Sequence, residues 1–169
     1  MSDQKQKVSG VSVVGLWVCL VAIAGYVSLP LLAAWSDDPS LKFGVYAFPI
    51  WLVSVMVHWR FPLDPWPIGR TLYAVLAAGL LFLGILGELQ AMVYLAFALL
   101  LSLPITQSVN RMIAGCIGML WTPLWSWSMG PFLGTSINAV SLGLAGAFFF
   151  YSITIRISSN EPKANNPAL

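Results

Sequence analysis

The stretch "LLFLGILGELQAMVYLAFALLLSLP", residues 80–104, decides the fold class. Two apolar runs flank the short polar interruption "GELQ" at 87–90, and the second run ends at a proline. Neither run alternates apolar and polar residues, as a membrane β-strand would. A helix needs about 20 mostly apolar residues to cross the hydrocarbon core of a bilayer. The stretch therefore predicts two membrane helices joined by a tight turn that exposes Glu88 to water.

The rest of the chain has the same apolar character. Hydrophobic residues make up 59% of its 169 residues, charged residues make up 8%, and the mean hydropathy is +0.83. A soluble domain has about 25% charged residues, so this composition cannot cover a water-facing surface. The formal net charge of +2 and the lack of a basic stripe argue against nucleic-acid binding. We expect one membrane domain.

Six apolar segments predict an all-α membrane protein, a polytopic bundle of about six transmembrane helices. The expected spans are 11–34, 43–59, 70–87, 89–106, 110–129 and 132–155. The fifth span overlaps "WTPLWSWSMGPFLG" at 121–134, so a re-entrant loop and fewer spans are an alternative. The first span is too long for the apolar region of a signal peptide. The expected limits are an N-terminal tail at 1–10, a transmembrane domain at 11–157 and a polar C-terminal tail at 158–169.

Basic residues are concentrated on one side of this predicted bundle. With six spans, the two termini and the loops at 59–70 and 106–111 share a side, and only Lys42 of the 8 basic residues falls on the other. The residues on the shared side are Lys5, Lys7, Arg60, Arg70, Arg111, Arg156 and Lys163. Cytoplasmic loops carry such an excess of Lys and Arg. Both termini are therefore predicted to be cytoplasmic, and we expect the bacterial inner membrane.

The opposite, outer side is predicted to hold a docking surface. Asp37 and Asp38 supply charge there. Tryptophans supply amphipathic anchors, namely Trp35, Trp121, Trp125 and Trp127. Tryptophans at the ends of spans are also typical of the interfacial belt. Two interpretations are open, an interfacial belt and a docking surface for lipid, pigment or a partner protein.

One pattern on this outer side resembles a known family. The pattern W-S-D-D-P-S-x-x-x-G-x-x-x-x-P runs from Trp35 to Pro49, and an apolar run ending at Arg60 follows it. It resembles the N-terminal part of the exosortase/archaeosortase family, with Gly44, Pro49 and Arg60 in the family's positions. The resemblance covers roughly residues 30–130. It implies a polytopic membrane enzyme that processes exported proteins at the outer face.

The chain departs from that family in its catalytic residues. The family has a cysteine in a Cys-Ser-Gly motif, followed by an arginine and then a histidine. Here Cys116 stands in "AGCIGM" without Ser-Gly, Arg111 precedes it, and His58 lies earlier still. We therefore assign no catalytic residue. Cys19 and Cys116 have no Cys-X-X-Cys or Cys/His spacing, so we expect two small buried side chains and no metal ligands.

His58 is the only histidine. A lone histidine in a membrane helix can be the axial ligand of haem or chlorophyll through its neutral ring nitrogen. A haem with two histidine ligands from this chain is excluded by the count. A histidine next to Trp59 at a helix end is also typical of the membrane interface. Lipid is expected to bind, whereas pigment or haem is conceivable without being indicated.

Two functions follow from these patterns. The first is a non-catalytic integral membrane subunit, or an assembly or stabilising factor, of a larger membrane complex. Its partners would be other integral membrane proteins and membrane lipids, with no nucleic acid. The alternative is an exosortase-type cysteine protease or transpeptidase, or half of one, that processes exported proteins. A transporter is less favoured, because no inverted repeat or polar cluster at mid-membrane is visible in the sequence.

Overall fold

The computed structural model describes residues 2–39, 41–59 and 67–160, with side chains described at 13–39, 41–59 and 67–157. Within these ranges the regular structure is helical, and the single β-type pairing is an isolated bridge between Trp59 and Ile105. The all-helical prediction is therefore confirmed for this part of the chain. Of the predicted tails, 161–169 lies outside the described residues, and no side chain of 1–10 or 158–160 is described.

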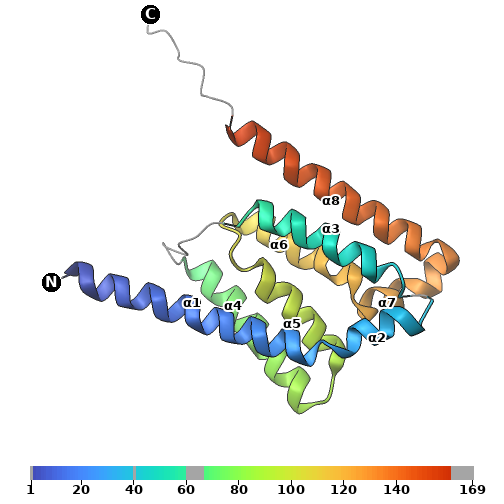
Figure 1. Cartoon of the computed structure of the whole chain (residues 1–169), viewed down its shortest axis with the longest axis horizontal. Coiled ribbons are helices and arrows are strands. Elements are labelled where there is room, and N and C mark those ends of the chain that lie inside the picture. The colour runs from blue at the N-terminus through green and yellow to red at the C-terminus, as the bar shows by residue number, and fades with distance from the viewer. Residues whose placement is uncertain (1, 40, 60–66, 161–169) are drawn as a thin grey trace, which may run out of the picture.

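The described residues form α-helices and two short 3-10 helices, which run back and forth along the molecule (Figure 1). The α-helices are α1 (Ser2–Val27), α2 (Pro30–Asp37), α3 (Gly44–Val57), α4 (Ile68–Leu86), α5 (Gln90–Ser102), α6 (Ser108–Ile117), α7 (Pro123–Leu133) and α8 (Ile137–Asn160). The 3-10 helices are η1 (Gly118–Trp121) and η2 (Gly134–Ser136).

Prolines and one left-handed residue set the helix ends. Pro30 and Pro123 are the first residues of α2 and α7. At this position a backbone N–H would have no partner within the helix, so proline, which lacks the N–H, is tolerated. The α4–α5 turn places Glu88 at φ 55°. There the N–H of Leu89 donates to the carbonyl of Gly84 at 2.8 Å, the bond that closes a Schellman turn. Glu88 is exposed in this turn, as predicted.

Within the described residues two helical segments are long and apolar enough to cross a membrane, Ile68–Leu86 and Pro123–Ile157. The pair Val13–Val27 and Pro30–Asp37, bent by 40°, makes a third if it is one span. The apolar helices α3 and α5 have 14 and 13 residues, fewer than the roughly 20 that a span needs. The predicted fifth span is not one helix. It divides at η1, because the proline ring at the start of α7 cannot continue the preceding helix.

The helices pack in pairs. The helices α4 and α5 form an antiparallel hairpin, α3 lies against α8, and α1 lies against α5. Gly84 makes the hairpin tight, since a Cβ at this position would lie 2.8 Å from Cγ2 of Val93. The larger buried cluster joins α2, α3, α5, α6 and α8 around Trp51 and Trp121. A second cluster joins α1, α4 and α5 around Leu81 and Leu100.

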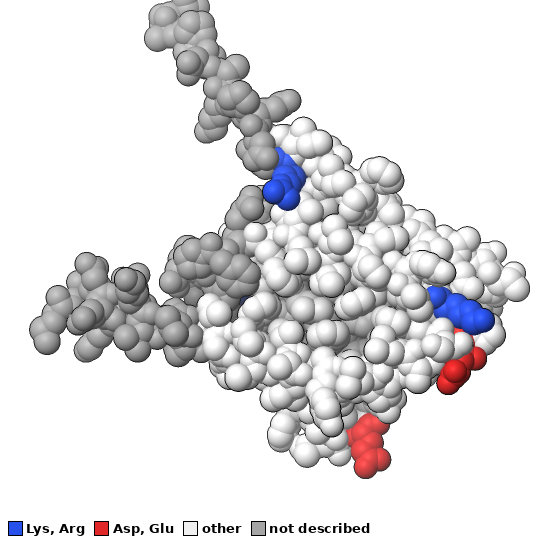
Figure 2. All heavy atoms as spheres, in the orientation of Figure 1, with Lys and Arg blue, Asp and Glu red and all other residues white. Residues whose placement is uncertain are grey.

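The connections gather at two ends of the bundle (Figure 1). At the end that we name the basic end, α3, α5 and α8 finish and α4 and α6 begin, with the described basic side chains Arg70, Arg111 and Arg156. The acidic end comprises α2, α7 and the α2–α3 and α4–α5 connections, with Asp37, Asp38, Lys42 and Glu88. In Figure 2 the red residues lie over these two connections. The described charges are thus separated along the bundle.

Candidate functional site

The acidic end holds all six residues of the predicted docking surface, in different surroundings. Asp37 and Asp38 are exposed at the end of α2, and Trp127 is 64% exposed on α7. Trp35 and Trp121 are 6% and 1% exposed and belong to the core. Trp125 is partly buried and its indole N–H donates to Oγ of Ser141 at 2.7 Å. The surface available to a partner is therefore the two aspartates and Trp127, and Trp35 and Trp121 do not contribute surface to it.

Trp35 and Trp121 are buried because they form the aromatic centre of the bundle. Their rings meet edge to face with centroids 6.4 Å apart, and the ring of Phe48 lies 4.9 Å from Trp121. A Cβ at Gly44 would overlap the indole of Trp35. The glycine of the Trp35–Pro49 pattern therefore has a packing role here, because only glycine lets α3 approach this indole.

Tryptophan N–H groups bind carbonyls near the C-terminal ends of α5 and α6. The indole of Trp17 donates to the carbonyl of Leu100 at 2.7 Å. This carbonyl lacks the usual N–H donor four positions later, because that residue is Pro104, and its backbone partner is the N–H of Leu103 at 3.3 Å. Trp59 donates to the next carbonyl, that of Leu101, at 3.1 Å. Trp51 donates to the carbonyl of Ala114 at 2.8 Å. These bonds join α1 and the end of α3 to α5, and they join α3 to α6.

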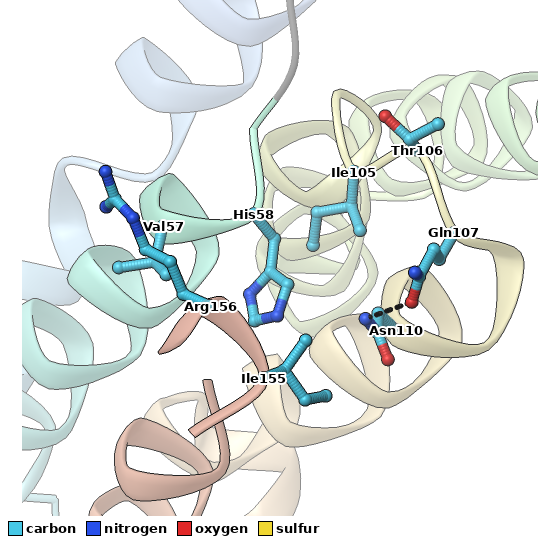
Figure 3. A pocket seen from close by; sticks show the side chains of 8 residues that line it. All are labelled: Val57, His58, Ile105, Thr106, Gln107, Asn110, Ile155 and Arg156. Carbon is cyan, nitrogen blue, oxygen red and sulfur yellow. Dashed lines mark hydrogen bonds between the residues drawn. The ribbon is translucent and has the colours of Figure 1, made fainter. Parts of the chain in front are cut away.

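A small polar pocket lies at the basic end (Figure 3). It has a volume of about 240 Å³ and is lined by Val57, His58, Ile105, Thr106, Gln107, Asn110, Ile155 and Arg156. The amide of Asn110 donates to the side-chain oxygen of Gln107 at 2.7 Å and accepts from the hydroxyl of Tyr151 at 3.3 Å. The side chains come from α3, α6, α8 and the loop before α6, so four segments of the chain build this pocket.

His58 lines this pocket, and one of its two ring nitrogens has no hydrogen-bond partner among the described residues. Its Nδ1 lies 3.1 Å from the carbonyl oxygen of Ser54, and because a carbonyl only accepts, Nδ1 carries the hydrogen. In the neutral ring Nε2 is then an acceptor, and it is buried without a hydrogen-bond partner among the described residues. The pocket suits a water molecule or a small hydrogen-bond donor.

The assignment of His58 as an axial ligand of pigment or haem stays a prediction, and the pocket beside it is small. The pocket is smaller than the ~300 Å³ at which sites for drug-sized ligands begin, and a haem or chlorophyll is at least that large. Within the described residues no group of three or more His, Cys, Asp or Glu side chains is placed to hold a metal ion. The structure shows that His58 lines this polar pocket with its Nε2 unpartnered among the described residues.

A larger and more apolar groove of about 640 Å³ runs between α4, α5 and α6. It is lined by Gly69, Leu72, Tyr73, Leu76, Leu80, Leu95, Leu99, Ser108, Arg111, Met112, Gly115, Cys116 and Met119. At its basic end the hydroxyl of Tyr73 bonds Oγ of Ser102 at 2.7 Å and donates to the carbonyl of Arg111 at 3.3 Å. The guanidinium of Arg111 lies over the ring of Tyr73, 5.4 Å from its centroid.

The expectation that both cysteines are buried is wrong. Cys19 and Cys116 are exposed, free thiols on outward faces of α1 and α6. Apolar neighbours in the sequence do not distinguish the interior of a bundle from a face turned toward lipid. Cys116 lines the apolar groove and His58 lines the polar pocket, so the two are in separate cavities. Ser40 and Arg60, which belong to the exosortase-like pattern, lie outside the described residues.

Sequence reasoning missed the polar corner of the groove. The sequence alone did not mark Tyr73 or Ser108 as site residues, because single hydroxyl groups near span ends are common in membrane helices. Arg111 was interpreted as a topological charge and, because it precedes Cys116, was not assigned as the exosortase arginine. The one sequence feature that could have indicated this corner is Gly115 on the same helix as Arg111. The absence of a side chain at Gly115 leaves room for the hydroxyl of Tyr73.

The chain matches none of the protein-family models, and searches of the curated proteins and of the solved structures find no match. The resemblance to exosortases accordingly rests on the sequence pattern from Trp35 to Pro49. Any function has to follow from the residues and geometry of the chain itself.

Proposed function

We propose that this chain is an integral protein of the bacterial inner membrane, with six spans and both termini in the cytoplasm. Its support is the distribution of the described charges, with Arg70, Arg111 and Arg156 at one end of the bundle and the described carboxylates with Lys42 at the other. A cytoplasmic basic end agrees with the excess of Lys and Arg in cytoplasmic loops.

The short helices α3 and α5 are compatible with six spans, because protein groups cover the backbone at the end of α5. At 1.5 Å per residue, α3 and α5 are about 20 Å long, less than the ~30 Å hydrocarbon thickness. Irregular backbone at membrane depth is tolerated where protein covers it. The carbonyls of Leu100 and Leu101 at the end of α5 are covered in this way by Trp17 and Trp59.

The chain's proposed role is that of a non-catalytic subunit that assembles or stabilises a larger membrane complex. The observation that carries this proposal is the acidic end, where Asp37, Asp38 and Trp127 face outward over a tightly bonded aromatic core. Binding hot spots are enriched in tryptophan, and charges around them favour the correct partner. A partner at the outer membrane surface with basic residues fits this arrangement.

Gentle purification of variants tests this role. We expect the triple variant Asp37→Asn, Asp38→Asn, Trp127→Ala to bind its co-purifying membrane proteins about tenfold or more weakly, as for the loss of a hot spot. The measurement is quantitative mass spectrometry of the fraction bound per mole of chain. Glu88→Gln is the matched control, because it removes an exposed carboxylate from another turn of the same end.

Two results would contradict the role. One is a wild-type chain that purifies alone, since a subunit needs partners. The other is an equal loss of partners in Glu88→Gln, which would point to overall charge instead of the α2–α7 surface.

One observation favours an exosortase-type enzyme as the second candidate. Arg111 and Cys116 line the same groove, and enzymes with a cysteine nucleophile combine it with other polar groups in one site. A second polypeptide would then have to supply the histidine, because His58 lines the separate pocket. Processing of an exported protein that stops in Cys116→Ser and continues in Cys19→Ser would support this candidate over the subunit.

A further inference from the structure

The apolar groove between α4, α5 and α6 ends at a buried cation. Arg111 is 3% exposed, and one of its terminal nitrogens donates to the carbonyl of Ile105 at 2.9 Å. Its Nε is buried and has no hydrogen-bond partner among the described residues. The described carboxylates belong to α2 and the α4–α5 turn at the acidic end. Among the described side chains no carboxylate pairs with Arg111, and a buried charge that lacks a counter-ion is strongly unfavourable, so this corner is suited to an anion.

The backbone at the same corner also favours an anion. The helix α6 begins at Ser108, and no side chain caps its first turn. The first N–H groups of an α-helix have no partner within the helix and point toward negative charge. Because Arg111 reaches back to the carbonyl of Ile105, its guanidinium lies beside this helix start. Ser108 lines the groove there and adds a hydroxyl donor.

The remainder of the groove is suited to a hydrocarbon chain. Leucines of α4 and α5 line it together with Met112 of α6 and Met119 of η1. Leu72 and Leu80 are eight residues apart on α4, which corresponds to a length of about 12 Å. The groove volume of about 640 Å³ lies within the range of roughly 300–1,000 Å³ for small-molecule sites. Methionines adapt their shape to flexible apolar ligands.

We propose that this groove binds one anionic phospholipid, with its phosphate at Ser108 and Arg111 and an acyl chain along the leucines of α4. A phospholipid fits better than a free phosphate, because the anion corner opens directly into an apolar groove. The site lies at the basic end, so it is independent of the proposed partner surface at the acidic end. Placing the bound headgroup in the cytoplasmic leaflet rests on the proposed orientation.

Native mass spectrometry of the full chain tests the site. The purified protein is exchanged into mild detergent with phosphatidylglycerol or with phosphatidylcholine of the same acyl chains. We expect one tightly retained phosphatidylglycerol per chain and about tenfold weaker retention of phosphatidylcholine. We expect Arg111→Gln to lower phosphatidylglycerol binding by about tenfold or more and Arg111→Lys to keep most of it. Arg156→Gln is the matched control, since it removes a charge from the same end outside the groove.

A second pair of variants covers the case in which Arg111→Gln does not fold. Cys116 is exposed within the groove, so Cys116→Phe fills it without changing charge. We expect this variant to lose phosphatidylglycerol and Cys19→Phe, on α1, to retain it. Equal binding of the two lipids, equal loss in Arg156→Gln, or unchanged binding in Cys116→Phe would overturn the proposal. Displacement of the lipid by inorganic phosphate alone would also overturn it, because the site would then be an ion site.

Discussion

The centre of the bundle and the outer face of α4 are built from equally apolar residues and have opposite surroundings. In the centre Trp51, Val55 and Leu100 are fully buried. On α4 the side chains of Leu72, Val75, Leu76, Phe82, Leu83 and Leu86 are all more than half exposed. In water such an exposed patch would mark a binding surface or a route to aggregation. In a bilayer it is the expected contact with lipid.

This difference shows that hydropathy alone does not distinguish inside from outside in such a chain. What distinguishes the centre is its polar bonding and close backbone approach. Trp51 donates to the carbonyl of Ala114, and a Cβ at Gly118 would lie 2.7 Å from that of Ala98. On the outer face of α4 the exposed side chains are purely hydrocarbon, and Gly79 has no other atom within 4 Å of an added Cβ. Substitutions in the two regions should therefore have very different consequences.

The largest expected effect is at Trp51. Trp51→Ala removes a fully buried indole and leaves a cavity, so we expect the free energy of unfolding to fall by about 3–5 kcal/mol. The matched change on α4 is Phe82→Ala, with an expected effect of less than about 0.5 kcal/mol. Unfolding followed by circular dichroism in mixed micelles measures both. Similar losses for the two variants would remove the distinction between the regions.

The second prediction compares the two regions by substituting a glycine in each and measuring the change in stability. Gly118→Ala places a methyl group against Ala98 and the ring of Trp51, so we expect a loss of about 1–3 kcal/mol from overpacking. Gly79→Ala adds a methyl group to open space on α4 and replaces a poor helix former. We expect it to be neutral or to stabilise by up to about 1 kcal/mol. The same unfolding experiment applies, and a destabilised Gly79→Ala would show that this face of α4 is packed against something.

Most of the helical layout could be predicted from the sequence, because apolar runs and polar interruptions are local signals. The turn at Glu88 was predicted, as were helices over most of each expected span. The division of the fifth span at Pro123 was visible only as an alternative. The lengths of α3 and α5 were not predictable, because the points where these helices end depend on partners such as Trp59, which are remote in the sequence.

The candidate sites were less predictable than the fold. Trp35 and Trp127 have similar local sequence surroundings, and only packing shows that one is in the core and the other at the surface. The anion corner at Arg111 depends on Ser108, on Tyr73 from another helix and on a groove that three helices form. Residues that come together from several helices leave no pattern within a short stretch of sequence, so a single sequence does not reveal such a site.

The smallest effect tests whether the tryptophan bonds really compensate for missing helical ones. Trp17→Phe removes the indole donor to the carbonyl of Leu100 and leaves the longer bond from the N–H of Leu103, and we expect it to cost about 0.5–1.5 kcal/mol of stability. In a Pro104→Ala background the restored N–H supplies a new helical donor to that carbonyl, so the same substitution should then cost less.

The double-mutant cycle isolates this coupling, because the packing lost with the indole ring is common to both backgrounds. A coupling near zero would mean that Trp17 contributes through ring contacts, such as its edge-to-face pair with Trp59. The centre of the bundle would then differ from the face of α4 in packing alone.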